Sequence, residues 1–488
     1  MTLLLLLAVQ CTGCSTAHET SRSIQPTAGT AHLLSSSPYP SIKKEIDALL
    51  ADSMFPPSNI AIMVVSLQSD EVLYELNSRL LFNPASNQKL FTAAAALAFL
   101  GEDFGVRTVL SVDTTNGPRI FLRGFGDPLL THHEVDSLAK ALSALIPTGR
   151  HWKLSRDVSY FDSLYWGSGW AWDDEPDPTA MFISPLSVDN NAIRVTIRPG
   201  TAAGEQTEVA TSPETKSVTI ENAGQTVIDS VLNHVRASRR WLERTNTITV
   251  TGEMHPWDSA TTKIVSMWQP ERYTTALFAE RLQAYGVQVE VDEPGPISAT
   301  AFEAVSHTRR VDSIVAYMNR VSDNLSAENL LKILGAEQHG APGSAGKGIS
   351  VVKEFLGSQG FDTTRISIAD GSGVSRYNLL SAESIISLLH IMYERREHFE
   401  AFYNSLAVSG ETGSLSNRMK GTLAQGNLRG KTGTLTGASS LSGYVRTADG
   451  ELLAFSILMQ NFLGKVTAYR QLQDRICVFL SGLRRASL

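Results

Sequence analysis

The sequence predicts an α+β fold in which one domain is interrupted by an inserted region rich in β-strands. The two ends of the chain combine apolar strands with helical patterns, whereas residues 106–305 alternate short strand-like runs with turns. The chain has 488 residues, of which 42% are hydrophobic and 19% are charged. It can therefore build a sizeable core, divided over about two to four domains.

The flanking segments, residues 41–105 and 306–488, have the pattern of a sheet flanked by helices. Residues 60–76 predict two strands around a Ser69-Asp70 turn, and residues 439–458 predict a hairpin with its turn at 448–450. Helical patterns occupy residues 42–50, 86–100, 311–319, 327–334 and 468–483. Because Gly101 suits a C-terminal cap, we expect the second of these helices to end there.

Residues 106–305 are expected to form one or two inserted β-rich domains. Strand-like runs end at Gly200, Asn222 and Met254, and one helical pattern, near residues 273–285, interrupts them. His132 and His133 fall within this region, and we expect them to be solvated.

The N-terminus predicts export. Residues 1–14 contain an apolar run, Leu3 to Val9, which resembles the end of a secretory signal peptide. Gly13-Cys14-Ser15, which follows, also resembles a bacterial lipobox. The protein would then be periplasmic, either free or anchored as a lipoprotein through Cys14. Residues 15–40 are rich in Ser, Thr, Ala and Pro, which predicts a flexible tether.

Composition excludes several kinds of chemistry. The net charge of −7 argues against nucleic acid as a partner. No His or Cys cluster has the spacing of metal ligands, so we expect neither a metal nor another cofactor. With three cysteines, two of them in the leader, no disulfide framework can form, and Cys477 in an apolar stretch is expected to be buried.

Candidate catalytic residues begin with a Ser-x-x-Lys pattern, which occurs five times and so carries little weight by itself. The matches are Ser41–Lys44, Ser86–Lys89, Ser137–Lys140, Ser344–Lys347 and Ser350–Lys353. Ser86–Lys89 differs from the others because two rarer patterns follow it: Ser-Asp-Asn at 322–324 and Lys-Thr-Gly at 431–433, each found once. The set S-x-x-K, S-D-N and K-T-G is known from penicillin-binding proteins and class A β-lactamases.

The chain resembles the D-alanyl-D-alanine carboxypeptidase/endopeptidase family of low-molecular-mass, class C type penicillin-binding proteins. Besides the three motifs, four blocks carry the resemblance: GFGDP at 124–128, GWAWDD at 169–174, DGSGVSR at 370–376 and LSGY at 441–444. The 236 positions between Ser86 and Ser322 fit a family with domains inserted between the first two motifs. The resemblance implies a β-lactamase/transpeptidase-like domain, an antiparallel sheet flanked by helices.

The proposed chemistry requires an activated serine. A serine hydroxyl needs an adjacent base, and residues three apart share a helix face, so Lys89 can place its amine beside Ser86. Burial and a neighbouring cation, such as Lys431, would favour the neutral amine.

Other roles follow from the resemblance. Ser322 would relay a proton to the leaving amine, and Asn324 would hydrogen-bond the substrate amide and Lys89. Lys431 and Thr432 would hold the terminal carboxylate of the peptide, while Gly433 lets the strand approach the ligand closely.

The remaining expected contacts involve Thr434 and Arg376. The backbone N–H groups of Ser86 and Thr434 would form the oxyanion hole, and Arg376 would face the substrate side of the cleft.

Three functions remain open at this level. The first is a serine DD-peptidase that acts on peptidoglycan stem peptides, as carboxypeptidase, endopeptidase or both, and that β-lactam antibiotics acylate as covalent inhibitors. The second is a β-lactamase, for which no convincing deacylating loop is evident. The third is a non-catalytic cell-wall binding protein that has kept the fold.

Overall fold

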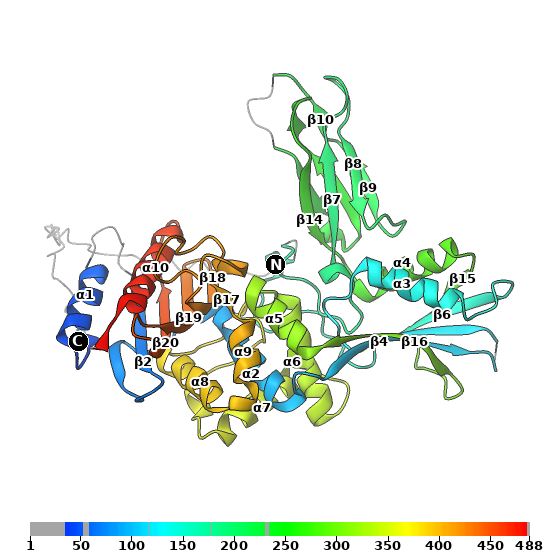
Figure 1. The fold of residues 1–488 in the computed structure, drawn as a ribbon. Helices are drawn as coiled ribbons and strands as arrows, with labels where there is room; N and C mark the ends of the chain where they lie inside the picture. Colours follow the sequence, from blue (N-terminus) through cyan, green and yellow to red (C-terminus); the bar gives the residue numbers. More distant parts are fainter. Residues whose placement is uncertain (1–34, 52–57, 116, 176, 230–233, 486–488) are drawn as a thin grey trace, which may run out of the picture. The chain divides into compact units, whose positions relative to one another are not determined.

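The computed structural model describes residues 35–51, 58–115, 117–175, 177–229 and 234–485, and those from Ser35 onward cluster into one unit (Figure 1). The predicted signal segment, Cys14 and residues 15–34 of the predicted tether lie outside the described residues. Residues 35 and 36, at the end of the segment expected to be a tether, pair with a strand of the main sheet.

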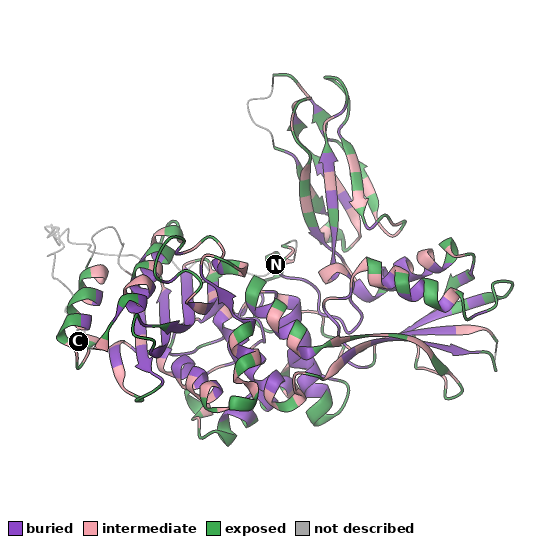
Figure 2. Ribbon diagram, viewed as in Figure 1, coloured by how far each residue is buried: buried purple, intermediate pink, exposed green. Residues whose placement is uncertain are grey.

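The main sheet has seven antiparallel strands in the order β1-β3-β2-β20-β19-β18-β17. In that order they are β1 (Ser35–Ser36), β3 (Val72–Leu76), β2 (Asn59–Ser66), β20 (Leu452–Gln460), β19 (Ala438–Arg446), β18 (Arg429–Leu435) and β17 (Ala407–Val408). Figure 2 shows the central strands as buried. β2 and β20 are nearly continuous apolar runs because both faces of the sheet are covered.

The two faces of this sheet belong to two separate cores. Along β20, Leu453, Phe455 and Ile457 join one cluster, while Leu452 and Leu458 join the other. This alternation follows from the two-residue period of a strand. The first core is closed by α1 (Pro40–Leu50) and α10 (Thr467–Gly482).

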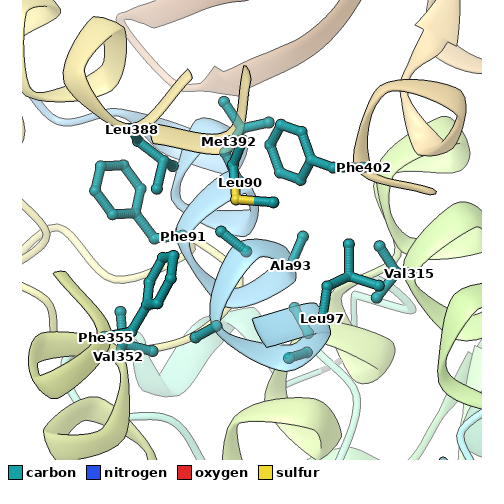
Figure 3. Close-up of a cluster of buried hydrophobic side chains, with 14 of the residues drawn as sticks. Leu90, Phe91, Ala93, Leu97, Val315, Val352, Phe355, Leu388, Met392 and Phe402 are labelled. Carbon is teal, nitrogen blue, oxygen red and sulfur yellow. The ribbon is translucent and has the colours of Figure 1, made fainter. Parts of the chain in front are cut away.

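The second core is organised around α2 (Lys89–Leu100). Every residue of α2 from Lys89 to Leu97 is buried, as expected of a helix that is apolar on all sides. Five helices supply its surroundings: α5 (Val311–Val321), α6 (Asn324–His339), α7 (Ala345–Ser358), α8 (Ala382–Glu394) and α9 (Arg396–Ser405). In Figure 3, Leu90 and Leu97 of α2 lie among side chains from four of them, including Phe355 and Phe402.

The inserted region contains a five-stranded sheet with two helices. Its order is β15 (Gln288–Val291), β6 (His151–Asp157), β5 (Arg119–Gly124), β4 (Gly105–Asp113) and β16 (Phe302–Arg310). α4 (Pro270–Ala284) corresponds to the one helix predicted here, whereas α3 (His132–Ser143) was not predicted. His132 is correspondingly half-buried, with Nδ1 2.8 Å from Asp189 Oδ2, and not solvated as expected.

Smaller sheets complete the inserted region. One comprises β14 (Thr261–Ser266), β7 (Ala192–Arg198) and β8 (Glu208–Ser212); a second comprises β11 (Arg236–Arg239), β12 (Thr247–Thr251) and β9 (Thr219–Asn222); and β10 (Gln225–Thr226) pairs with β13 (Glu253–Met254). The predicted α+β fold class is confirmed. None of the helices in the described part of the chain is long and apolar enough to cross a membrane.

Candidate active site

The first motif lies at the start of α2, next to the main sheet. Ser86 belongs to a short 3₁₀ turn, Ala85–Gln88, and α2 begins only at Lys89, three residues later than expected for the helix start. Ala85 has a φ of 47°, a left-handed conformation that costs energy for a residue with a Cβ. The turn places Lys89 Nζ 3.1 Å from Ser86 Oγ, within reach of a proton transfer.

Lys89 is a buried amine with three polar contacts. Besides Ser86, its Nζ donates to Asn324 Oδ1 at 2.6 Å and to the Ser372 carbonyl at 2.6 Å. Complete burial lowers the pKa of Lys89 to about 8, against the opposing effect of nearby carboxylates, of which Asp370 is the strongest. At neutral pH roughly a tenth of such an amine is unprotonated, far more than for a lysine with a pKa near 10.4.

The second motif bridges two helices. Ser322 caps the C-terminus of α5 in a left-handed conformation, φ 66°, and its Oγ accepts a 2.8 Å hydrogen bond from Lys431 Nζ. Asp323 caps the N-terminus of α6 by accepting from Ser326 N, so Asn324 is free of the capping role. Asn324 therefore directs its amide oxygen at Lys89.

Two contacts from the inserted region hold this motif. Asn190 Nδ2 donates to Asp323 Oδ1 at 2.8 Å, and Asn324 Nδ2 donates to the Thr179 carbonyl at 2.7 Å. Asn190 is itself left-handed, φ 60°. The inserted region thus fixes the orientation of both side chains that follow Ser322.

The third motif runs along β18, whose Lys431 is fully buried. Among the described residues no carboxylate lies within ion-pair distance of its Nζ, which donates instead to Ser322 Oγ and to the Thr432 carbonyl. Burial lowers the pKa of Lys431 well below its ordinary value, and the charge of Lys89 lowers it further. The charge of Lys89 therefore disfavours protonation of Lys431, whereas burial is what lowers the pKa of Lys89.

Gly433 lets β18 pass close to the nucleophile. A Cβ on this residue would lie 2.2 Å from Ser440 Oγ and 2.9 Å from Ser86 N, closer than real side-chain atoms come. The N–H groups of Ser86 and of the strand after Gly433 are consequently near neighbours. Thr434 Oγ1 accepts from Arg470 Nη2 at 2.9 Å, and Thr432 Oγ1 donates to Ser414 Oγ at 2.7 Å.

A cleft of about 760 Å³ opens over these motifs. Its walls include Ser86, Ser322, Asn324, Arg376 and the strand 432–436. Three carboxylates of the inserted region, at positions 173, 174 and 177, and a second guanidinium, at 470, also line it. The cleft can therefore receive a ligand that carries both an anionic and a cationic group beside the nucleophile.

A buried acidic network supports Lys89, and no local pattern in the sequence indicates the role of Glu328 in it. Glu328 Oε1 accepts from the N–H groups of Gly371 and Ser372, at 3.1 and 2.8 Å, and so orients the carbonyl that Lys89 contacts. Asp370 accepts from Trp170 Nε1 at 2.9 Å, which gives that tryptophan a polar role besides packing. Burial and the charge of Asp370 raise the pKa of Glu328.

Two of the other Ser-x-x-Lys matches have structural explanations. Ser344 Oγ caps α7 by accepting from Lys347 N, and Ser137 Oγ donates to a backbone carbonyl of its own helix. Cys477 is buried, as predicted, and burial raises the pKa of its thiol. Across the described residues no group of three or more His, Cys, Asp or Glu side chains could hold a metal ion.

Comparison with known proteins identifies the family to which the chain belongs. The sequence profile of the D-Ala-D-Ala carboxypeptidase 3 (S13) family matches residues 42–482. The D-alanyl-D-alanine carboxypeptidase of Actinomadura sp. (strain R39) is 34% identical over 462 residues, covering 90% of this chain and 84% of that protein. The D-alanyl-D-alanine carboxypeptidase DacB of Haemophilus influenzae is 25% identical over 412 residues, covering 82% and 84%.

Solved structures agree in fold. The crystal structure of penicillin binding protein 4 (dacB) from Haemophilus influenzae matches with a TM-score of 0.77 at 22% identity, covering 90% of this chain and 99% of the other. A complex of that protein with a β-lactam matches with a TM-score of 0.73 at 21% identity, covering 90% and 100%. The chain belongs to the D-Ala-D-Ala carboxypeptidase 3 (S13) family.

Proposed function

We propose that this protein is a serine-type D-Ala-D-Ala peptidase of peptidoglycan, with Ser86 as its nucleophile. The observation that carries the proposal is the convergence of three motifs far apart in sequence. Lys89 Nζ lies 3.1 Å from Ser86 Oγ, and Lys431 Nζ lies 2.8 Å from Ser322 Oγ. The family and the names of the relatives support the same activity.

Acylation would begin at the carbonyl carbon of the penultimate D-alanine. The neutral amine of Lys89 accepts the proton of Ser86 Oγ as that oxygen attacks. The C–N bond to the terminal D-alanine then breaks, and the leaving nitrogen receives a proton through Ser322. Water subsequently hydrolyses the ester on Ser86, with Lys89 again taking a proton.

Binding would use β18 as a template. The stem peptide lies along the strand, as a peptide added to a sheet edge does, and its terminal carboxylate meets Lys431 and Thr432. The N–H groups of Ser86 and Thr434 stabilise the oxyanion, and Asn324 holds the substrate amide. Arg376, whose Nη2 donates to the Thr436 carbonyl at 2.8 Å, borders the same end of the cleft.

A β-lactam would acylate Ser86 because its strained amide occupies the position of the D-Ala–D-Ala bond. The complex of the Haemophilus protein with a β-lactam supports this part of the proposal. Endopeptidase cleavage of a cross-link is the same reaction with a larger leaving amine. The open cleft gives no reason to restrict the enzyme to carboxypeptidase action.

We further propose that the protein works after export, in the periplasm, with residues 41–105 and 306–488 as the catalytic domain and 106–305 as the inserted domains. A lipid anchor at Cys14 would keep it at the membrane. Globomycin sensitivity of its processing in a bacterial host, absent in Cys14→Ala, tests the anchor.

The decisive experiment uses two readouts on the purified protein. Intact mass after incubation with benzylpenicillin should show one stable adduct that Ser86→Ala lacks, and a peptide ending in D-Ala-D-Ala should release D-alanine. Fast loss of penicillin without an adduct would indicate a β-lactamase instead. If the protein formed no adduct and released no D-alanine, the result would favour a non-catalytic binding protein with the same fold.

A further inference from the structure

A second cavity, of about 390 Å³, lies in the inserted region and shares no lining residue with the Ser86 cleft. Its walls come from the end of β6, from the segment 158–165, from the first turn of α4 and from residues 294–296. None of the sequence motifs maps to it. The mechanism proposed for Ser86 does not use it.

Arg156, near the end of β6, is the first unusual feature of this cavity. The residue is 7% exposed and lines the cavity. In the described structure its guanidinium has neither a hydrogen-bond acceptor nor a carboxylate within ion-pair distance, and burial lowers its pKa. A buried cation is costly unless it is paired, so this side chain has the properties of a ligand contact.

Glu271, the second residue of α4, is the complementary feature. It is 4% exposed, and its Oε1 accepts a 3.1 Å hydrogen bond from the Tyr165 hydroxyl. Its other oxygen, Oε2, is buried and receives no hydrogen bond from any residue that the structure describes. The charge of Glu271 acts on Arg156, yet the two groups do not form an ion pair. As far as the described residues show, the cavity therefore offers one free cation and one free carboxylate oxygen.

The other charged groups on the walls are already occupied. Asp162 accepts from Lys332 Nζ at 2.6 Å, and Asp157 lies 3.5 Å from Arg123 Nε. The rest of the lining includes apolar side chains, among them Phe161 and Ile183. Two free charges of opposite sign beside an apolar wall match a molecule with a carboxylate, an ammonium group and a short carbon side chain.

We propose that this cavity binds a free α-amino acid. Its carboxylate would meet the guanidinium of Arg156, its ammonium group would donate to Glu271 Oε2, and its side chain would lie against Phe161 and Ile183. The inference does not depend on the activity of Ser86. The alanine released by a D-Ala-D-Ala peptidase is one amino acid of this class.

Equilibrium dialysis of the full chain with radiolabelled D-alanine and L-alanine tests the proposal. Saturable binding is expected in the native protein and in Ser86→Ala, which separates the result from the active site. Arg156→Met and Glu271→Gln should each weaken it by about tenfold or more. Lys153→Met, which removes an exposed cation from the same strand, should bind like the native protein.

Competition experiments test whether the site recognises both charged groups of the amino acid. N-acetyl-D-alanine and D-alaninamide, which lack the ammonium and the carboxylate respectively, should compete at least about tenfold less well than D-alanine. Equal competition by N-acetyl-D-alanine would overturn the zwitterion assignment, because a peptide end would then suffice. No saturable binding, or binding that survives in a folded Arg156→Met and in the isosteric Glu271→Gln, would overturn the site itself.

Discussion

A buried arginine of the inserted region is ion-paired, whereas the two buried lysines around Ser86 have no carboxylate partner among the residues that the structure describes. Arg239, 2% exposed, forms a 2.6 Å ion pair with Glu175, whereas Lys89 and Lys431 are equally buried and, within the described part of the chain, their amines donate to neutral groups. Pairing stabilises a charge that serves structure, while an unpaired amine has a lowered pKa and can exchange a proton. The contrast distinguishes lysines that can act in chemistry from cations that hold the fold.

A comparison within one core sharpens this contrast. Lys332 of α6 is nearly as buried as Lys89, but it is paired with Asp162 at 2.6 Å. Arg156 of the inserted region lacks a partner among the described residues, which is the reason for assigning it to a second binding site. The predictions below test these distinctions in order of expected effect.

The largest effect is expected for Lys89→Met. Loss of the base should slow acylation by benzylpenicillin by about a thousandfold, while thermal stability stays the same or rises because a buried amine has been removed. Lys332→Met is the matched control: it should lower stability by leaving Asp162 unpaired and change the acylation rate little. Near-native acylation by Lys89→Met would contradict the assignment of the base.

Truncation of a core side chain should lower the stability of the protein equally in the two regions, but it should leave the acylation rate unchanged when it is made in the inserted region. Leu97→Ala in α2 and Ile248→Ala in β12 each remove a fully buried side chain, so each should lower the free energy of unfolding by about 3 kcal/mol. Urea titration followed by tryptophan fluorescence measures this. Ile248→Ala should acylate at the native rate at 25 °C, and a large loss would show that its module is needed for the chemistry.

Asn190→Ala should have an intermediate effect. Without its 2.8 Å bond to Asp323, the Ser-Asp-Asn segment loses a support, and kcat for D-alanine release should fall by about tenfold with a smaller change in KM. Asn246→Ala is the control, since the side chain of Asn246 bonds to the backbone of Trp268, which lies within the inserted region. If both variants kept native kcat, the inserted region would not position the second motif.

The smallest effect is expected for Arg240→Ala. Arg240 forms an exposed ion pair with Glu221, with side chains 41% and 43% exposed. Such pairs contribute little, so the free energy of unfolding should change by less than about 0.5 kcal/mol. A loss comparable to that of a buried pair would contradict the view that this exposed pair contributes little to stability.

Much of the catalytic region could be predicted from local patterns. The three motifs led to the residues that meet around Ser86, and the apolar runs at 439–458 gave the hairpin of β19 and β20. α3 was missed even though Thr131 and Glu134 form its capping box, because two histidines open the helix and weaken its apolar pattern. The predicted start of α2, at Ser86, is three residues too early, because the 3₁₀ turn at Ala85–Gln88 also brings residues three apart close together.

Long-range partners could not be predicted. Glu328 accepts a hydrogen bond from the Ser372 N–H group, and Asn190 donates one to Asp323. Nothing local in the sequence distinguishes Glu328 or Asn190 from other residues of their type. The pairing state of a buried lysine is hidden for the same reason. Lys89 and Lys332 both lie in apolar helical sequence, and only the fold reveals that Asp162 reaches one of them.

The pH dependence of acylation tests the central claim most directly. If the base is neutral Lys89 with a pKa of about 8, the second-order rate constant for benzylpenicillin should rise with pH and level off above that value. The sign follows because deprotonation creates the reactive form, while the carboxylate of the antibiotic stays ionised throughout. A midpoint near 10, as for an ordinary lysine, or a rate independent of pH would contradict the account.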